Sequence, residues 1–352
     1  MPPEFKLPRL GKGAGARQLR LKEIVAFAIG LMEIGASYGY KVSVRGWCYI
    51  LEGLRLIDKD QFALCESIIN ECRREGLLPV DFVAEEEARG FSGIEIPEDR
   101  RIDEYLLSNL NVYLNLGRIY TPDWWKGEEY YIQMVVEKVD LKTIFLSTCK
   151  DYKIPIATSK GWSSLLQRAD YARRFKEAEE NGLMGVLLYC GDHDPDGLRI
   201  SDTIRKNLSD LANAKWEDGT EGYDPSNLII DRFGLNYDFI TANNLTWIDN
   251  LLTGAGKNLA DPEHHNHNMP YVQEYLAKIG VRKCEANAIM SHPSEGEMLV
   301  RNAIEKYLGT DSRDRFKKKR LDIIAEFEQY IGEGTKAGDA VRMAIDELKG
   351  GG

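Results

Sequence analysis

Long apolar runs are absent from this 352-residue sequence, and none approaches the ~18 residues that a membrane-spanning helix needs. The first residues also lack the apolar segment of a secretory signal, which predicts an intracellular protein without a membrane anchor. A chain of this length is too long for most single hydrophobic cores. Two domains with extensions are therefore expected.

Cysteine pairs are absent as well. The six cysteines stand at positions 48, 65, 72, 149, 190 and 284, and no two of them form a CxxC pair. This spacing excludes a typical zinc cage and the disulfide framework of a small secreted domain, and it predicts reduced, buried thiols. The glycine-rich segments at 11–15 and 254–257 lack the GxxxxGK(S/T) spacing of a nucleotide-binding P-loop. If the activity requires ATP, another chain has to supply the ATPase.

Positive charge is scarce overall, since the formal net charge is −10. Two segments are nevertheless basic. Residues 1–45 hold eight Lys/Arg against three Glu, and Arg313–Arg320 holds six basic residues against one Asp, so each has a net charge of +5. Such islands on an acidic chain can bind DNA, although a solvated helix face gives the same pattern. Residues 1–18 lack any periodicity and are expected to form a flexible basic arm.

Apolar spacing in the N-terminal part predicts helices at Leu19–Ile34 and Lys59–Arg74. A short helix is expected after Ser43, a good N-cap, and Val80–Val83 is a strand candidate. Three helices followed by an extended segment is the order of a winged-helix DNA-binding module. We place this expected module at residues 19–85.

The middle of the chain alternates between strand-like and helical segments, which predicts an α/β domain. Residues 86–129 are expected to be a linker with a helix at Ile102–Leu116. The strands predicted after it are Tyr131–Val136, Ile154–Ala157, Gly185–Cys190 and Leu228–Phe233, with helices at Leu141–Asp151, Ser163–Glu180 and Gly197–Leu211 between them. Such alternation predicts a mostly parallel, Rossmann-like sheet at residues 130–250. Residues 251–352 are expected to be a mainly helical C-terminal extension.

Carboxylates follow two of the predicted strands. The run YIQMVV leads into Glu137, and the run GVLLYCG leads into the acidic segment Asp192–Gly197 (DHDPDG). Ligands collect at the carboxyl ends of the strands in parallel sheets. Mg²⁺ is commonly bound by one or two carboxylates, with water and phosphate completing its shell. The two acidic strand ends therefore predict a divalent-metal site.

Other interpretations of these residues exist. Asp-Pro-Asp-Gly is a turn-forming string, and a lone Glu after an apolar strand is typically a solvated strand end. The DxDxDG run also resembles the start of an EF-hand loop, but its twelfth position is Thr203 instead of Glu. His264, His265 and His267 are a second candidate for metal binding. A polar loop is the simpler interpretation there, because no other ligand group accompanies them.

The two acidic motifs together resemble the Toprim domain, a metal-binding fold of topoisomerases, bacterial primases and some nucleases. Between them, Ile156–Gly161 (IATSKG) resembles the Lys-Gly segment of topoisomerase VI A subunits and their meiotic double-strand-break relatives. Upstream, Ser43–Tyr49 (SVRGWCY) resembles the segment in which that family has an arginine four residues before its nucleophilic tyrosine. Ile68–Pro79 and Asp231–Leu235 extend the similarity, which runs from about residue 40 to residue 250.

The resemblance implies that Tyr49 is a nucleophile and that Arg45 assists it. A phenol with a pKa near 10 is ionised to roughly one part in a thousand at neutral pH, so forming phenolate costs about 4 kcal/mol. Arg45 lies one helical turn before Tyr49 and can lower that cost. The sequence departs from many relatives at Cys48, where they have an aromatic residue.

The same resemblance implies the metal ligands and a DNA contact. Glu137, Asp192 and Asp194 would bind Mg²⁺. Asp196 is a carboxylate that some relatives lack, and it would be either an additional ligand or a helix N-cap. Lys160 would contact a DNA phosphate.

The implied function is that of a type IIB topoisomerase A subunit, which cleaves double-stranded DNA through 5′-phosphotyrosyl links. In the family the subunit is a homodimer, so that Tyr49 of one protomer would work with the metal of the other, and the ATPase is on a separate B subunit. Two alternatives remain. One is a nuclease that cuts DNA with water at a metal site, and the other is a non-catalytic DNA-binding protein that has kept the fold.

Overall fold

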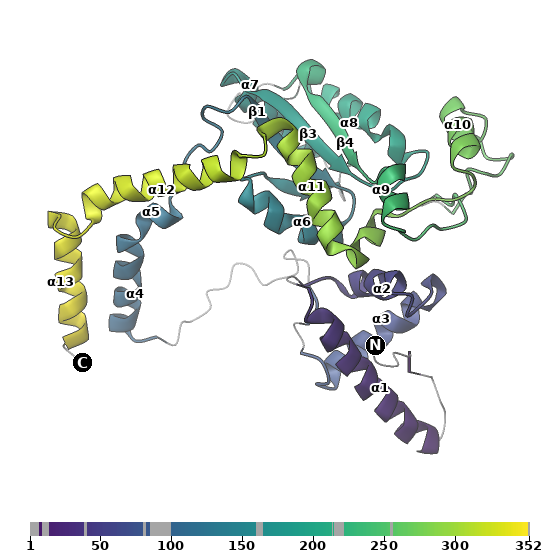
Figure 1. The fold of residues 1–352 in the computed structure, drawn as a ribbon, viewed down its shortest axis with the longest axis horizontal. Coiled ribbons are helices and arrows are strands. Elements are labelled where there is room, and N and C mark those ends of the chain that lie inside the picture. Colours follow the sequence, from purple (N-terminus) through teal and green to yellow (C-terminus); the bar gives the residue numbers. More distant parts are fainter. Residues whose placement is uncertain are drawn as a thin grey trace. The chain divides into compact units, whose positions relative to one another are not determined.

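The computed structural model describes residues 7–8, 14–38, 41–79, 82–84, 100–159, 165–212, 214, 222–253 and 256–350. The chain divides into two compact units, one of residues 1–85 and 129–307 and the other of residues 86–128 and 308–352 (Figure 1). These units cross the expected boundaries. The expected linker belongs with the last helices, whereas residues 251–307 belong with the sheet.

A parallel sheet of four strands is the centre of the first unit. Its order is β2 (Ile156–Thr158), β1 (Tyr130–Val136), β3 (Met184–Cys190) and β4 (Ile229–Gly234). Six of the seven residues of β1 and of β3 are buried, as expected of central strands covered on both faces. The prediction of an α/β chain with a parallel sheet is confirmed, and the arrangement is compatible with a Rossmann-like fold.

Helices cover both faces of this sheet. Helices α6 (Val139–Asp151) and α11 (Pro293–Leu308) lie on one face, and α7 (Leu165–Glu180) and α8 (Ile200–Ser209) lie on the other (Figure 1). The shorter elements of the unit are η3 (Gly197–Arg199), η4 (Pro225–Asn227), α9 (Tyr237–Ala242), α10 (Pro270–Lys278) and η5 (Ala286–Ser291). A small separate core of Leu251, Leu259, Val272 and Tyr275 stabilises the segment around α10.

The N-terminal part of the first unit contains α1 (Ala14–Gly35), α2 (Val44–Gly53), η1 (Lys59–Gln61) and α3 (Phe62–Arg74). These agree with the three expected helices, although α1 begins at Ala14 and so overlaps the expected arm. A winged-helix domain is not shown. Within residues 14–84, the described residues include no strand, because Phe82 and Val83 form a bend and residues 80 and 81 lie outside the described part.

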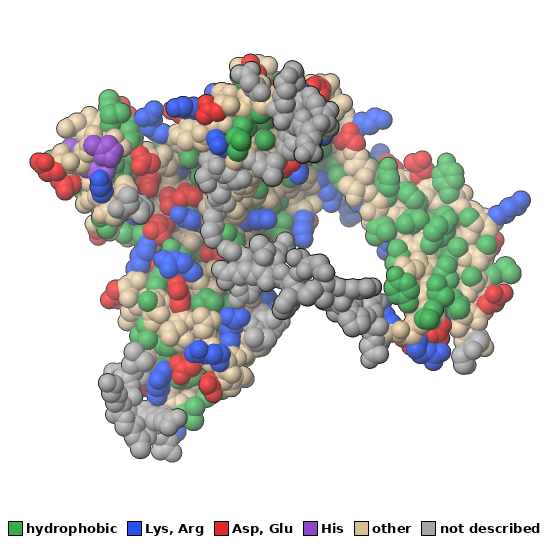
Figure 2. Space-filling view, turned by 180° about the vertical axis from the view of Figure 1, so that it is seen from behind, with side chains coloured by type: hydrophobic (Ala, Val, Ile, Leu, Met, Phe, Trp, Pro, Cys, Tyr) green, Lys and Arg blue, Asp and Glu red, His purple; other side chains and the backbone are tan. Residues whose placement is uncertain are grey.

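The second unit consists of α4 (Ile102–Leu114), α5 (Leu116–Ile119), α12 (Ser312–Ile331) and α13 (Lys336–Gly350). No residue of α4 is buried, and Figure 2 shows apolar side chains gathered over this unit. The most exposed of them are Ile102, Ile119, Leu321, Tyr330 and Met343.

Half of the C-terminal basic segment is used to build this second unit. Arg315 forms an ion pair with Glu128 at 2.7 Å, and Lys319 Nζ donates to the carbonyl oxygens of residues 124 and 126 at 2.8 Å each. The Arg320 guanidinium lies 4.8 Å from the Trp124 ring centroid. Lys317 and Lys318 are exposed. The segment therefore holds residues 124–128 against α12 and also presents exposed lysines.

Two expectations from composition can be compared with the structure directly. All six cysteines are free and buried, as predicted. Among the residues that the structure describes, no helix is both long enough and apolar enough to cross a membrane.

Candidate functional site

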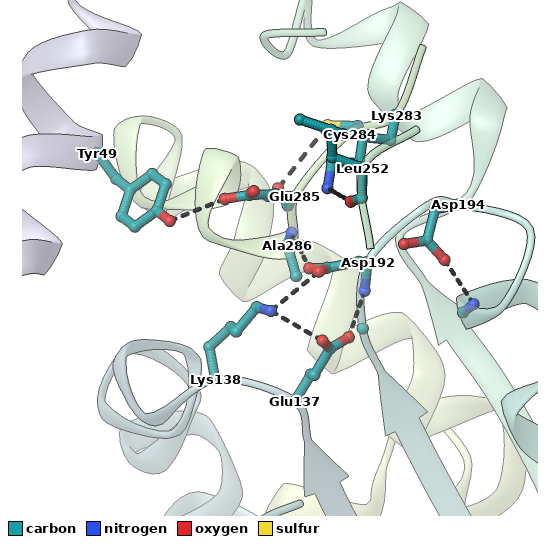
Figure 3. A network of polar contacts seen from close by, with 12 residues as sticks. Tyr49, Glu137, Lys138, Asp192, Asp194, Leu252, Lys283, Cys284, Glu285 and Ala286 are labelled. Atoms are coloured by element: carbon teal, nitrogen blue, oxygen red, sulfur yellow. Dashed lines mark hydrogen bonds and ion pairs between the residues drawn. The ribbon is translucent and has the colours of Figure 1, made fainter. Parts of the chain in front are cut away.

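Glu137 and Asp192 lie side by side because they follow adjacent parallel strands. Val136, the last residue of β1, pairs with Cys190, the last residue of β3. The backbone N–H of Glu137 donates to the Cys190 carbonyl at 2.9 Å, and Glu137 Oε2 accepts from the backbone N–H of Asp192 at 2.8 Å. The predicted meeting of these two acidic strand ends is therefore present in the fold (Figure 3).

A lysine bridges the two carboxylates. Lys138 Nζ lies 2.8 Å from Glu137 Oε1 and 2.9 Å from Asp192 Oδ2. Burial alone would lower the pKa of Lys138, but the two carboxylates more than offset this effect and raise it. Burial and the nearby Glu137 raise the pKa of Asp192 to about 6, against the opposing effects of Lys138 and of a backbone N–H. The oxygens of Glu137 and Asp192 are thus already arranged around a positive charge.

Asp194 and Asp196 have local partners instead. Asp194 Oδ1 accepts from the backbone N–H of Gly197 at 2.6 Å, and Asp196 Oδ1 accepts from the Tyr271 hydroxyl at 2.9 Å. Burial raises the pKa of Asp194. Within the described part of the chain, no group of three or more His, Cys, Asp or Glu side chains stands in a metal-holding arrangement. The expectation that Glu137, Asp192 and Asp194 share one cation stays a prediction.

The loop that carries these aspartates is held in place from β4 by Arg232. Its guanidinium donates to the carbonyls of Gly197 at 2.9 Å, Asp192 at 2.9 Å and Leu235 at 2.8 Å. A side chain at Gly197 would place its Cβ 2.3 Å from the Asp192 carbonyl oxygen, so the turn requires glycine there. Asp192 and Asp194 are therefore positioned by the backbone of their own loop and by one half-buried arginine.

The acidic strand ends line a pocket of about 530 Å³. Its charged lining residues are Lys59, Glu137, Lys138, Asp192, Asp194, Asp196, Lys283 and Glu285. Three of these are lysines from different parts of the chain. A pocket with mixed charge suits a ligand that is itself anionic and a cation that accompanies it.

Tyr49 lies behind one wall of this pocket. It belongs to α2, is 6% exposed, and its ring meets the Phe62 ring edge-on at a centroid distance of 5.1 Å. Its hydroxyl donates to Glu285 Oε2 at 2.8 Å (Figure 3). The other oxygen of Glu285 is paired with Lys59 Nζ at 2.8 Å. Glu285 therefore separates the phenol from the space of the pocket.

The surroundings of Tyr49 keep it protonated. Burial raises the pKa of the phenol, and the Glu285 carboxylate raises it further, while Arg45 acts in the opposite direction. Arg45 itself is paired with Glu66 at 3.0 Å. For Glu285, burial raises the pKa, but Lys59 and the Tyr49 hydroxyl lower it by more. Arg45 lowers the pKa of Tyr49 by less than burial and Glu285 raise it, and its assistance to the nucleophile stays a prediction.

A short segment links Tyr49 to the acidic strand ends. The residue after Glu285 is Ala286, whose backbone N–H donates to Asp192 Oδ1 at 2.8 Å. Cys284, which precedes Glu285, exchanges two backbone hydrogen bonds with His193, at 2.8 Å and 3.1 Å. The phenol and the Asp192 carboxylate are therefore neighbours of the same three-residue segment.

Sequence reasoning missed Lys59 and Glu285. Lys59 stands in a polar stretch before a helix, and Glu285 lies beyond residue 250, outside the family similarity. The one available signal was the charge of Glu285 within the largely apolar stretch from Cys284 to Met290. That signal does not identify a partner 236 residues away in the chain.

The remaining candidates are Lys160 and the histidines of the segment 264–267. Lys160 lies outside the described residues. His264 Nδ1 accepts from the backbone N–H of Asn266 at 3.1 Å, and His267 Nδ1 lies 3.0 Å from the Leu259 carbonyl oxygen. These contacts are local, as in the polar-loop interpretation.

Comparisons with family models, with curated proteins and with solved structures gave no match to this chain. The case for a function therefore depends on the site itself and on the residues quoted for the family resemblance.

Proposed function

We propose that this chain is a DNA-cleaving subunit of the topoisomerase VI A type, in which Tyr49 attacks a phosphodiester beside a divalent-metal site. The observation that carries the proposal is the connection between the phenol and the strand-end carboxylates. The Tyr49 hydroxyl donates a hydrogen bond to Glu285. The backbone N–H of the next residue, Ala286, donates a hydrogen bond to the Asp192 carboxylate. A nucleophile and a carboxylate cluster that meet in this way are the two parts that such a reaction needs.

The residues at the strand ends fit Mg²⁺. Glu137 and Asp192 each place an oxygen within 3 Å of the Lys138 nitrogen, so their oxygens already converge on a cation. Two carboxylates, with water and phosphate completing the shell, are a common protein contribution to a Mg²⁺ site. Asp194 and Asp196 line the same pocket and are candidates for further contacts. When bound, the ion would supply charge that stabilises the phosphodiester in the transition state.

The residues of the chain itself would carry out the bond exchange at phosphorus. The Tyr49 oxygen forms a bond to phosphorus, and the bond from phosphorus to the 3′ oxygen breaks. The phenol loses its proton, and the departing 3′ oxygen ends as a hydroxyl, so the number of phosphate ester bonds is unchanged and the step can be reversed. The lysines of the pocket, Lys59, Lys138 and Lys283, provide positive charge for the phosphate.

The proposal includes partners that the family resemblance implies. Double-stranded DNA is the substrate, and Lys160 would contact one of its phosphates. A homodimer would provide two Tyr49 residues, one for each strand, and a separate B subunit would provide the ATPase. Arg45 would assist Tyr49, since it opposes the rise in the phenol pKa.

Covalent trapping tests this proposal. Duplex DNA labelled at a 3′ end is incubated with the protein and Mg²⁺ or Ca²⁺ and then denatured. The 3′ label should remain attached to protein, whereas a 5′ label on the same strand should be released with a free 3′ hydroxyl. Tyr49→Phe and Asp192→Ala should each abolish attachment. Tyr105→Phe, which removes an exposed hydroxyl from α4, is the matched control and should leave attachment unchanged.

Hydrolysis by water at the same pocket is the second candidate. The observation that favours it is that Tyr49 is buried behind Glu285 and is held protonated. In that case Tyr49→Phe should cut DNA as well as the wild-type protein does, Asp192→Ala should be inactive, and no label should stay with the protein.

A further inference from the structure

Glu285 holds two groups that a reacting phosphate would need. Its Oε2 accepts from the Tyr49 hydroxyl at 2.8 Å, and its Oε1 is paired with Lys59 Nζ at 2.8 Å. Lys59 Nζ also lies 5.9 Å from the centroid of the Tyr49 ring. One carboxylate therefore spans the proposed nucleophile and a cation in the wall of the pocket.

A phosphodiester resembles this carboxylate in charge and in hydrogen bonding. Each has one negative charge and two oxygens that accept hydrogen bonds from a hydroxyl and an ammonium group. We propose that Lys59 is a DNA-phosphate-binding residue beside the nucleophile, and that Glu285 occupies the position of the scissile phosphate until DNA displaces it. This inference rests on the proposed function, since it assigns the phosphate position for the same tyrosine.

The structure allows the Glu285 side chain to leave without moving its backbone. The backbone is held by Ala286, which donates to Asp192, and by the pairing of Cys284 with His193. The side chain is 18% exposed and the Lys59 side chain is 35% exposed, both in the lining of the pocket. A phosphate entering the pocket therefore reaches Lys59 and competes with Glu285 for it directly.

The backbone of Lys59 is fixed, so that its side chain alone can change partners. It is the first residue of η1, after Asp58, whose backbone N–H donates to Gln61 Oε1 at 2.9 Å. This capping fixes the backbone of Lys59 while its long side chain keeps the freedom to change partners. The raised pKa of Tyr49 beside the Glu285 carboxylate agrees with a resting state in which the phenol is not ionised.

Duplex binding by the full-length protein tests the exchange without any cleavage step. The affinity for a fluorescent 30-base-pair duplex is measured by anisotropy in EDTA over a range of salt concentrations. Glu285→Gln should tighten binding by about threefold to tenfold, because it removes a competing negative charge and releases Lys59. Lys59→Met should weaken binding and reduce the salt slope by about 0.9, the value for one phosphate contact. Lys59→Arg should keep most of the salt dependence of binding, because it keeps the positive charge.

The double variant gives the decisive readout. In the Lys59→Met background, Glu285→Gln should tighten binding much less than it does alone, because the lysine that it would release is gone. Glu71→Gln is the matched control. It makes the same charge change on α3, where Glu71 pairs with Arg20 at 2.6 Å, and it should have a smaller effect than Glu285→Gln.

Each other outcome overturns the exchange. If Glu285→Gln weakens binding or leaves it unchanged, the Lys59–Glu285 pair is only a structural ion pair. The same conclusion follows if the gains from Glu71→Gln and Glu285→Gln are equal, since net charge then explains both. Failure of the proposed function looks different, because wild-type protein would then trap no covalent DNA, whatever the binding data show.

Discussion

Tyr49 and Glu285 are 236 residues apart in the chain, yet the hydroxyl of one donates a 2.8 Å hydrogen bond to the carboxylate of the other. This contact joins a helix of the N-terminal part to the segment that follows α10. It also brings the proposed nucleophile within one residue of the contact to Asp192. The candidate site is therefore assembled from three parts of the sequence.

We expect Arg232→Ala to destabilise the first unit by about 3 kcal/mol, because it removes the hydrogen bonds to the carbonyl oxygens of Gly197, Asp192 and Leu235. Arg232→Lys should lose less stability than Arg232→Ala but should remain less stable than the wild type, since an ammonium group cannot donate to all of the same acceptors. Chemical denaturation measures both. Arg173→Ala, at an ion pair with Glu177 on the surface of α7, is the control and should change stability by less than about 1 kcal/mol. A similar loss for Arg173→Ala and Arg232→Ala would contradict the role of Arg232.

We expect Asp192 to make the metal-free protein less stable as pH rises. Burial and Glu137 raise the pKa of Asp192 from 3.8 to about 6 in the folded state, so the folded protein binds the proton more tightly than the unfolded chain does. The resulting stability is fully present below pH 3.8 and is lost as pH rises through about 6. Thermal unfolding in EDTA between pH 4 and pH 7 should show this loss, and Asp192→Asn should flatten it. An unchanged profile in Asp192→Asn would assign the dependence to another group.

We expect the lysines of the C-terminal basic segment to have two different roles, DNA binding and stabilisation of the second unit. Replacing the exposed Lys317 and Lys318 with Gln should weaken duplex binding and flatten the salt slope by up to about 1.8, while stability changes little. Lys319→Gln should instead destabilise the second unit, because Lys319 Nζ donates to two backbone carbonyls. Anisotropy titrations and thermal unfolding measure the two effects. If the Lys317 and Lys318 changes leave the slope unaltered, this segment is not part of the DNA surface.

We expect mixed dimers to reveal whether the site is shared between protomers. Tyr49→Phe and Asp192→Ala chains are each expected to be inactive, since one lacks the phenol and the other a metal ligand. If Tyr49 acts on the partner's metal site, a dimer of one chain of each kind contains one complete site and should nick one strand. Mixed chains that yield no nicked DNA, although they form dimers, would favour a site within one chain. The Tyr49–Glu285 contact within one chain makes this experiment informative in either direction.

Several features could be predicted from the sequence for clear physical reasons. The runs that became β1 and β3 are apolar apart from the buried Gln133, because both faces of these strands are buried. Two parallel neighbours then place Glu137 and Asp192 at the same sheet edge. The shortest strand was predicted two residues too early, at Ile154–Ala157. Pro155 has no N–H to donate, and the strand begins after it at Ile156.

The amino-acid sequence by itself determined the α/β class, the three N-terminal helices and the two acidic strand ends, because each depends on local periodicity and on strand order. Only the tertiary structure decided that Lys138 bridges Glu137 and Asp192, that Lys319 is used within the second unit, and that Glu285 lies between Tyr49 and the pocket. These contacts depend on which long side chains meet after distant segments pack. Hydrophobic periodicity records which face of a segment is buried but not which charged residue it will meet there.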